Sequence, residues 1–201
     1  RALADRRNER LPTGLFVKAL GDANPRVRLQ AAVGLGRLGR KEAAPDLVKL
    51  LSDPDPLVAH VVVNTLVSLR ASEACLAALD AGDLKACRVL QALHETAVVD
   101  GLLERLVRAS DPAPILKALC RLHTREAPWD GKWWGTRPDT TGPYYSPVKW
   151  EGSERIGKAL SSALGDAKPE ALRVLLVDLQ KNRVDLPEAG PLVLKLAAQD
   201  P

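Results

Sequence analysis

Cysteine is scarce in this chain, and the spacing of the few cysteines excludes several kinds of site. Cys75, Cys87 and Cys120 are an odd number and contain no CxxC pair and no CxxCH haem-attachment motif. All three lie in apolar, helical context, where a thiol behaves as a small core hydrophobe. We therefore expect buried, reduced cysteines, with no disulfide framework, no bound metal and no haem attached to this stretch.

Long apolar runs are also missing. No run approaches the roughly 20 residues that a membrane-spanning helix needs. No signal peptide is visible and the chain begins at Arg1, so we expect a piece of a longer protein and leave its compartment open. No glycine-rich phosphate loop, nucleophile elbow or pair of catalytic carboxylates is present either, and the sequence predicts neither an enzyme nor a cofactor.

Charge of one sign is in small excess only. Twenty-nine Lys and Arg against 25 Asp and Glu give a net charge of +4, which is too mild to indicate nucleic-acid binding. The excess lies at the start, because residues 1–50 hold eleven basic and five acidic side chains. A solvated helical face is the simpler interpretation of this basic stretch, and contact with phosphates is the alternative.

What the chain has in quantity is a repeat. Leu-Gly-Asp-Ala at residues 20–23 returns at residues 164–167, each time shortly before a proline, and residues 51–56 are a looser copy. Each copy separates two apolar helical stretches and so marks the turn inside a helix pair. Gly21 suits a left-handed helix end, Asp22 or Asn24 suits the next N-cap, and Pro25 suits the first turn.

A shift of 31 residues superimposes the first two repeats. It carries Pro25 onto Pro56, Val27 onto Val58 and Leu35 onto Leu66. A single amphipathic helix would not reproduce the proline and the core positions together. The sequence therefore predicts a right-handed all-α superhelix of about five and a half helix pairs over residues 1–201, built by stacking. The second helix of the third pair is expected over Asp83–Thr96, with Ala86, Leu90 and Leu93 facing inward.

The phase of the repeat predicts which side chains are buried. Residues expected to be nearly free of solvent contact are Val27, Leu35, Val58, Val62, Leu66, Leu116, Leu175 and Leu179.

The spacing of the turns exposes an insertion. Aspartates mark successive turns at intervals of 31, 27 and 31 residues, and the next marker, Asp166, comes late by about 25 residues on that period. The surplus matches residues 125–152, which are rich in proline and glycine and lack helical periodicity. We expect this segment to be ordered and docked beside the fourth and fifth pairs, because long structureless connections are uncommon.

The insert holds six of the seven aromatic residues of the chain. Tryptophan and tyrosine combine a large apolar surface with a polar group and dominate binding hot spots. Its candidate partner-binding or ligand-binding residues are Trp129, Asp130, Lys132, Trp133, Trp134, Arg137, Asp139, Tyr144, Tyr145 and Trp150. The alternative is that the rings only plug a gap in the solenoid. We expect Trp129 or Trp150 to anchor the insert, and at least one of the remaining rings to face a pocket.

The histidines were considered as metal ligands. Cys120 and His123 share a helix face, and His94 precedes His123 by about one repeat. Four ligands are needed within reach, and no carboxylate or second cysteine completes the set. Core or surface roles are therefore expected for His60, His94 and His123.

The helix pairs resemble HEAT-like repeats of the short bacterial kind, also found in phycobilisome lyases. The residues that carry the resemblance are Asp22, Pro25, Val27, Arg28, Ala31, Ala32, Leu35, Gly36, Leu38 and Gly39. The resemblance implies an Asp/Arg ladder along the inner helices. Arg28 fits that ladder, whereas Ala59 and Leu172 stand at the matching positions.

The insert has a narrower resemblance. Residues 129–139, followed by Gly-Pro-Tyr-Tyr at 142–145, are similar to a segment of large bacterial multi-domain proteins. Those proteins join a propeller-like dehydrogenase region, a HEAT array and a terminal c-type cytochrome module. The resemblance implies that this chain is the array of such a protein, and that it is exported.

These observations favour a non-enzymatic scaffold that binds a protein or small ligand through its concave face and the insert. Its partner would be another protein or a neighbouring domain of the same chain. A purely structural spacer is one alternative. A nucleic-acid-binding HEAT protein of DNA-glycosylase type is the other, with Trp133 or Trp134 acting beside Asp130 or Asp139; it is disfavoured because these carboxylates are far in sequence from the basic stretch.

Overall fold

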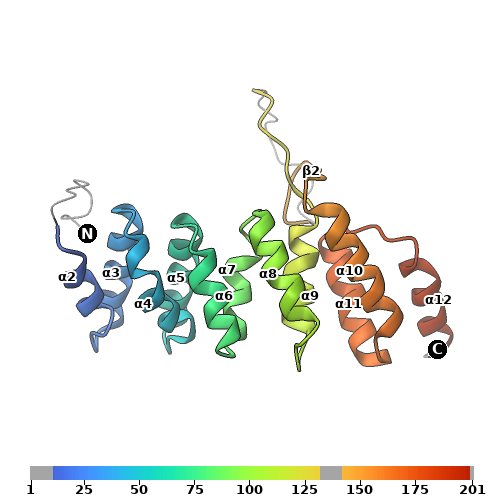
Figure 1. Ribbon diagram of the computed structural model, residues 1–201, viewed down its shortest axis with the longest axis horizontal. Helices are drawn as coiled ribbons and strands as arrows, with labels where there is room; N and C mark the ends of the chain where they lie inside the picture. The colour runs from blue at the N-terminus through green and yellow to red at the C-terminus, as the bar shows by residue number, and fades with distance from the viewer. Residues whose placement is uncertain (1–10, 132–141, 200–201) are drawn as a thin grey trace. The chain divides into compact units, whose positions relative to one another are not determined.

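The structure, a computed structural model, describes residues 11–131 and 142–199 and is mainly helical there (Figure 1). The chain divides into two compact units, Arg1–Leu93 and His94–Pro201. Each unit is a stack of helix pairs, which confirms the prediction of an all-α solenoid. That the two units form one continuous solenoid stays a prediction. No described helix is long and apolar enough to cross a membrane.

In the described part of the N-terminal unit, the second helices of successive pairs pack on one another: α3 on α5, and α5 on α7. The first helices form the other layer, in which α4 contacts α6. The elements are α2 (Thr13–Ala19), α3 (Pro25–Arg37), η1 (Lys41–Ala43), α4 (Ala44–Val48), η2 (Lys49–Ser52), α5 (Pro56–Ser68), α6 (Ser72–Asp80), η3 (Leu84–Ala86) and α7 (Cys87–Leu90).

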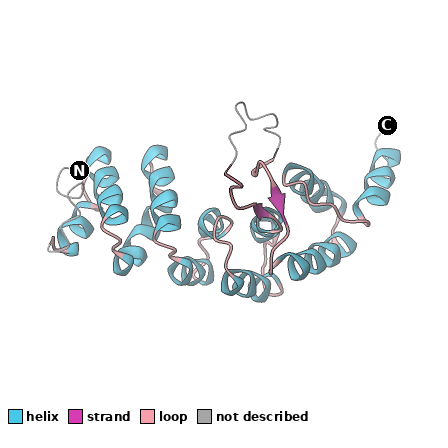
Figure 2. Cartoon of the chain, turned by 90° about the horizontal axis from the view of Figure 1, so that it is seen from above, coloured by secondary structure: helices cyan, strands magenta, loops and turns pink. Residues whose placement is uncertain are grey.

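The C-terminal unit repeats this two-layer arrangement. Helix α10 contacts α8 in one layer, α11 contacts α9 in the other, and α12 packs on α11. A short strand pair follows α9 (Figure 2). The elements are α8 (Thr96–Leu106), α9 (Ala113–Leu122), β1 (Arg125–Glu126), β2 (Pro147–Val148), α10 (Ser153–Asp166), α11 (Pro169–Lys181) and α12 (Ala189–Gln199).

The helix starts follow the predicted chemistry. The side chain of Asn24 accepts a hydrogen bond from the backbone N–H of Arg26 at 3.0 Å. Asp55, which stands 31 residues later, accepts one from Leu57 at 2.8 Å. Each cap is followed by a proline in the first turn, where no backbone donor is needed. The repeat therefore reproduces the whole start of the inner helix, which an amphipathic pattern alone would not specify.

The helix ends differ from the prediction at Gly21, which is not left-handed. The left-handed residue instead follows the second helix of three pairs, at Gly39, Arg70 and Arg183. Each stands 14 residues after the proline that opens its helix. The turn is closed by the same backbone bond each time, such as the one from the N–H of Arg40 to the carbonyl of Leu35 at 3.0 Å.

Gly39→Ala is expected to lower the free energy of unfolding by about 1 kcal/mol, because an L-residue pays roughly 1–2 kcal/mol in the left-handed region. Nothing lies within 4 Å of the new Cβ, so crowding adds no cost. The control is Gly14→Ala inside α2, which also meets open space and should be neutral or stabilising. Equal effects of the two substitutions in urea unfolding would contradict this explanation.

Most of the residues that the repeat predicts to be buried are buried in the structure. Residues with exposures of 0–3% as expected are Leu35, Val58, Val62, Leu66, Leu175 and Leu179. Val27 is 37% exposed and lines a hollow beside the short helix α2. Leu116 is half-buried, since the buried face of α9 is set by Ile115 and Leu119.

The third pair also departs from the prediction. No single helix spans Asp83–Thr96. A 3₁₀ turn leads into the short helix α7, which ends at Leu90, and α8 already begins at Thr96. The expected inward side chains Ala86, Leu90 and Leu93 are nevertheless buried. The apolar spacing predicted the burial correctly, although the backbone closes into shorter turns.

Candidate functional site

The insert leaves and re-enters the helical stack through a short strand pair. Strand β1 runs antiparallel to β2, with Arg125 opposite Val148 and Glu126 opposite Pro147 (Figure 2). One further backbone bond, from the N–H of Ala127 to the carbonyl of Ser146 at 2.8 Å, extends the pairing. The two ends of the insert are therefore held together before it continues outward.

We call the strand pair and the residues around it the base of the insert. The carboxylate of Glu126 adds two hydrogen bonds to this base. It accepts hydrogen bonds from the backbone N–H of Tyr145 at 2.6 Å and from that of Ser146 at 2.7 Å. Both bonds are charge-assisted, which makes them stronger than bonds between neutral groups. Glu126 thus satisfies two donors of the returning strand that strand pairing leaves open.

Helix α9 ends in carbonyl groups that no helical turn satisfies. The indole Nε1–H of Trp150 donates to the carbonyl of Leu122 at 2.6 Å, and the hydroxyl of Ser153 donates to that of His123, also at 2.6 Å. The backbone N–H of Trp150 in turn donates to the Ser153 hydroxyl at 2.8 Å. Trp150 and Ser153 therefore tie the end of the insert to the end of α9.

Two more side chains cap the neighbouring carbonyls. The hydroxyl of Tyr144 donates to the carbonyl of Arg121 at 3.3 Å. The Nε2 atom of His94 lies 2.9 Å from the carbonyl oxygen of Thr124, to which it donates. Four consecutive carbonyls, at residues 121–124, are thus capped by side chains, two of which belong to the insert.

His94 lies at the centre of this arrangement. Its ring makes edge contacts with the rings of Tyr144 and Trp150, with centroids 5.7 and 5.4 Å away. Because Nε2 carries the proton that bonds Thr124, Nδ1 is the nitrogen without a proton in the neutral form of the ring. Burial lowers the pKa of His94, and the cationic side chains of Arg125 and Arg121 add to this lowering.

His123 is the second histidine at the base of the insert. Only 7% of it is exposed, and its Nδ1 atom is buried without a hydrogen-bond partner among the described residues. Burial lowers the pKa of His123, and the nearby cation of Lys149 lowers it further. Both histidines are therefore held in the neutral form.

The structure brings some of the predicted site residues together and leaves others apart. Trp150 is an anchor, as expected, and Tyr144 is docked beside it. Trp129, the other expected anchor, is 72% exposed instead. Asp130 is exposed, and Tyr145 is half-buried. Five candidates lie outside the described residues, namely Lys132, Trp133, Trp134, Arg137 and Asp139.

Two glycines permit close packing at the base. A Cβ at Gly152 would lie 2.6 Å from the ring of Trp150, and one at Gly142 would lie 3.0 Å from the guanidinium group of Arg183. Glycine at these positions lets the indole and the guanidinium lie directly against the backbone. The base is therefore closely packed as well as hydrogen-bonded.

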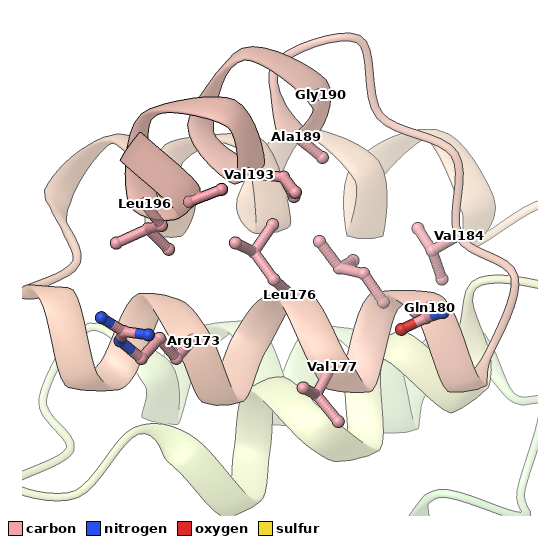
Figure 3. A pocket seen from close by; sticks show the side chains of 11 residues that line it. Arg173, Leu176, Val177, Gln180, Val184, Ala189, Gly190, Val193 and Leu196 are labelled. Atoms are coloured by element: carbon pink, nitrogen blue, oxygen red, sulfur yellow. The ribbon is translucent and has the colours of Figure 1, made fainter. Parts of the chain in front are cut away.

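Two hollows among the described residues are lined by side chains outside the insert. A groove of about 690 Å³ lies between α11 and α12, with Leu176 facing Val193 and Leu196 across it (Figure 3). A second, of about 450 Å³, lies between α2 and α3. That an exposed ring of the insert faces a pocket stays a prediction, because Trp133 and Trp134 lie outside the described residues.

The cysteines have the chemistry of core residues. All three are free and buried, as expected. Burial raises the pKa of Cys75 and Cys120 to about 12 and that of Cys87 to about 11, so their thiols are unreactive at neutral pH. Within residues 11–131 and 142–199, no three His, Cys, Asp or Glu side chains are grouped so that they could hold a metal ion.

In the N-terminal unit, one ion pair links consecutive helix pairs. The guanidinium of Arg28 on α3 donates to both carboxylate oxygens of Asp53 at 2.7 Å, and the two side chains are only 12% and 4% exposed. The same guanidinium donates to the carbonyls of Asp22 and Ala23. Residues 14–83 match the family model of HEAT repeats. Arg28 and Asp53 lie inside the HEAT-matched segment. A comparison with proteins of curated function found no match.

From this ion pair we predict how the stability of the HEAT-matched segment responds to acid. The bonds from Arg28 hold the pKa of Asp53 below its usual range, so the pair stabilises the fold above the ordinary aspartate pKa of about 3.9. That stability is lost as the pH falls through the lower, folded pKa. We expect Asp53→Asn to be less stable than the wild type at pH 7, and the difference to shrink below about pH 4. Urea unfolding across that range measures it, and a difference independent of pH would contradict it.

The capping role of His94 is not among those that the sequence predicts for this residue. A signal was present, because His94 precedes Thr124 by 30 residues, about one repeat. Residues one repeat apart occupy neighbouring positions in a solenoid. That spacing places His94 beside the end of the following inner helix, where a donor is needed.

Proposed function

We propose that this chain is a non-enzymatic scaffold that binds a protein partner, and that the insert after α9 is its main contact element. HEAT repeats commonly mediate protein interactions, and residues 14–83 match them. The second helices of the pairs would supply a further contact surface. The proposal assigns no chemical step to any residue.

The observation that carries the proposal is the contrast between two tryptophans of the insert. Trp150 is bonded and packed at the base, whereas Trp129 is 72% exposed. A large exposed ring on a rigid base is what a binding hot spot requires, because little conformational freedom is lost on binding. A plug, by contrast, would place both rings inside.

The chemistry of the exposed part favours an extended peptide segment. Trp129 follows Pro128 and precedes Asp130, so an apolar residue and an acidic residue are adjacent in the sequence. Such a surface suits a segment that carries proline or aromatic side chains together with a basic residue. The notion that this segment belongs to a neighbouring redox module of a larger exported protein is part of the proposal and rests on the resemblance of the insert alone.

Selection of peptides from a displayed random library on the immobilised chain tests the proposal. Selected peptides should bind the wild type and lose at least about 10-fold in affinity with Trp129→Ala, since central aromatic residues dominate such interfaces. Val107→Ala is the matched control, because Val107 is an apolar residue of the same unit that is 91% exposed. Peptides that bind both variants equally well would overturn the assignment to the insert.

Nucleic-acid binding is tested in parallel with a short DNA duplex. Binding to phosphates would weaken steeply between 50 and 200 mM salt. It would also weaken with Arg26→Ala, which changes an exposed residue of the basic stretch. That result, together with no selected peptide, would favour the nucleic-acid alternative.

A further inference from the structure

Cationic side chains act on both histidines at the base of the insert. Arg121 of α9 and Arg125 of β1 act on His94, and Lys149 of the insert acts on His123. The ring of His94 also contacts the rings of Tyr144 and Trp150, and the Tyr144 hydroxyl lies 3.3 Å from its Nε2 atom. A proton taken up by either ring therefore adds a positive charge beside another.

The surroundings of His94 favour the neutral form of its ring. Its Nε2–H bonds the carbonyl of Thr124, and its ring edges lie against two insert aromatics. Protonation places a charge and a second N–H in this half-buried position, where the charged form loses hydration. The hydrogen bond to the carbonyl of Thr124 favours the charged form and offsets a part of that cost, but burial and the two arginines leave the pKa of His94 lowered.

Protonation of His123 is also unfavourable. Its Nδ1 is already buried without a partner among the described residues, and protonation would turn it into an unsatisfied donor. The adjoining backbone carbonyl is the one that holds the Ser153 hydroxyl. A strained or displaced His123 would therefore disturb the contact that ties α10 and Trp150 to α9.

We propose that the base of the insert is a latch released by acid: when His94 and His123 take up protons, residues 142–152 leave the end of α9. In the latched state these residues cap α9 and hold the strand pair closed. In the released state the caps from Tyr144 and Trp150 are lost, and Trp129 is no longer held on a rigid base. The latch does not depend on which partner the insert binds.

The direction in which pH changes the stability of the latch follows from proton linkage. Released histidines have an ordinary pKa of about 6.5, and the latched ones have lowered pKa values. The released state therefore binds more protons, and the latch weakens as the pH falls below about 6.5, while it is constant above about 7. At pH 5.5 each histidine favours release by up to about 10-fold, and the two together by up to about 100-fold.

Hydrogen exchange of the full chain at pH 7.5 and 5.5, with times corrected for the intrinsic rate, tests the proposal. The amides of Ala127, Tyr145 and Ser146 report on the base, because each is bonded only when it is closed. We expect their protection to fall at least 10-fold at pH 5.5. The amides of α11 should stay protected. Unchanged protection at the base, or an equal loss in α11, would overturn the latch.

The double variant His94→Gln/His123→Gln identifies the groups. Glutamine at position 94 retains a donor for the carbonyl of Thr124 but does not titrate. Protection of the base should then be independent of pH over this range, and a persisting loss would overturn the assignment. Should the variant fold poorly, NMR titration of the wild-type histidine rings serves instead. Both rings must titrate below pH 6.5 together with the loss of protection, and ordinary titration of either would overturn its role.

Discussion

Trp150→Ala is expected to lower the free energy of unfolding of the C-terminal unit by roughly 2–4 kcal/mol. Truncating a buried tryptophan typically costs 3–5 kcal/mol, and Trp150 is half-buried. The substitution removes the ring contact with His94 and the bond to the carbonyl of Leu122. It also leaves that carbonyl, at the end of α9, without its protein donor. Urea unfolding of the full chain measures the change.

Two further variants separate the causes of the destabilisation by Trp150→Ala. Trp129→Ala is the matched control, since the same side chain is removed from the same insert at a position 72% exposed, and it should change stability by less than about 0.5 kcal/mol. Trp150→Phe keeps most of the ring and deletes the indole N–H, so it should cost about 1–2 kcal/mol. If the two alanine variants were equally stable, Trp150 would not be an anchor.

The second large effect is expected at Leu66, in the centre of the N-terminal unit. Leu66 is 0% exposed on α5, and α5 packs between α3 and α7. Leu66→Ala should lower the free energy of unfolding by about 2–5 kcal/mol through lost burial and the cavity left behind. A loss below 1 kcal/mol would show that the side chain is not in the core.

The control for this substitution lies on the same helix. Leu57 is 59% exposed in the first turn of α5, so Leu57→Ala should cost less than about 0.5 kcal/mol. The two leucines share helix, residue type and substitution, and they differ in burial. A ratio near one between the two effects would contradict the assigned face of α5.

How far the sequence predicts the fold is seen at two pairs of repeat positions. Leu35 and Leu66 are both fully buried, because a repeat of 31 residues keeps the caps, the helix length and the inward face in register. Val27 and Val58 share the same phase, yet only Val58 is covered. Periodicity identifies the face of a helix, whereas the neighbouring elements decide whether that face is covered.

The sequence predicts where the insert lies in the chain, but only a part of how the insert is held. Aromatic composition located the insert, and Trp150 anchors it. The sequence does not decide which of Trp129 and Trp150 is the anchor, because both stand near an end of the insert and have the same chemistry. The deciding feature is the set of open carbonyls at the end of α9, which exists only once the helix has ended. For the same reason His94, which is far from the insert in sequence, was not assigned to it.

The caps on α9 bear on the order in which the C-terminal unit forms. Helix pairs such as α8 and α9 are joined by short connections, and contacts of low sequence separation form early in folding. Tyr144 reaches its place beside His94 across 50 residues of chain, so a long loop must close before that contact adds stability. Helices α8 and α9 therefore pair first, with the end of α9 open to water. Docking of the insert follows, and a fluorescence probe at Trp150 would record it as a refolding phase later than the pairing of these two helices.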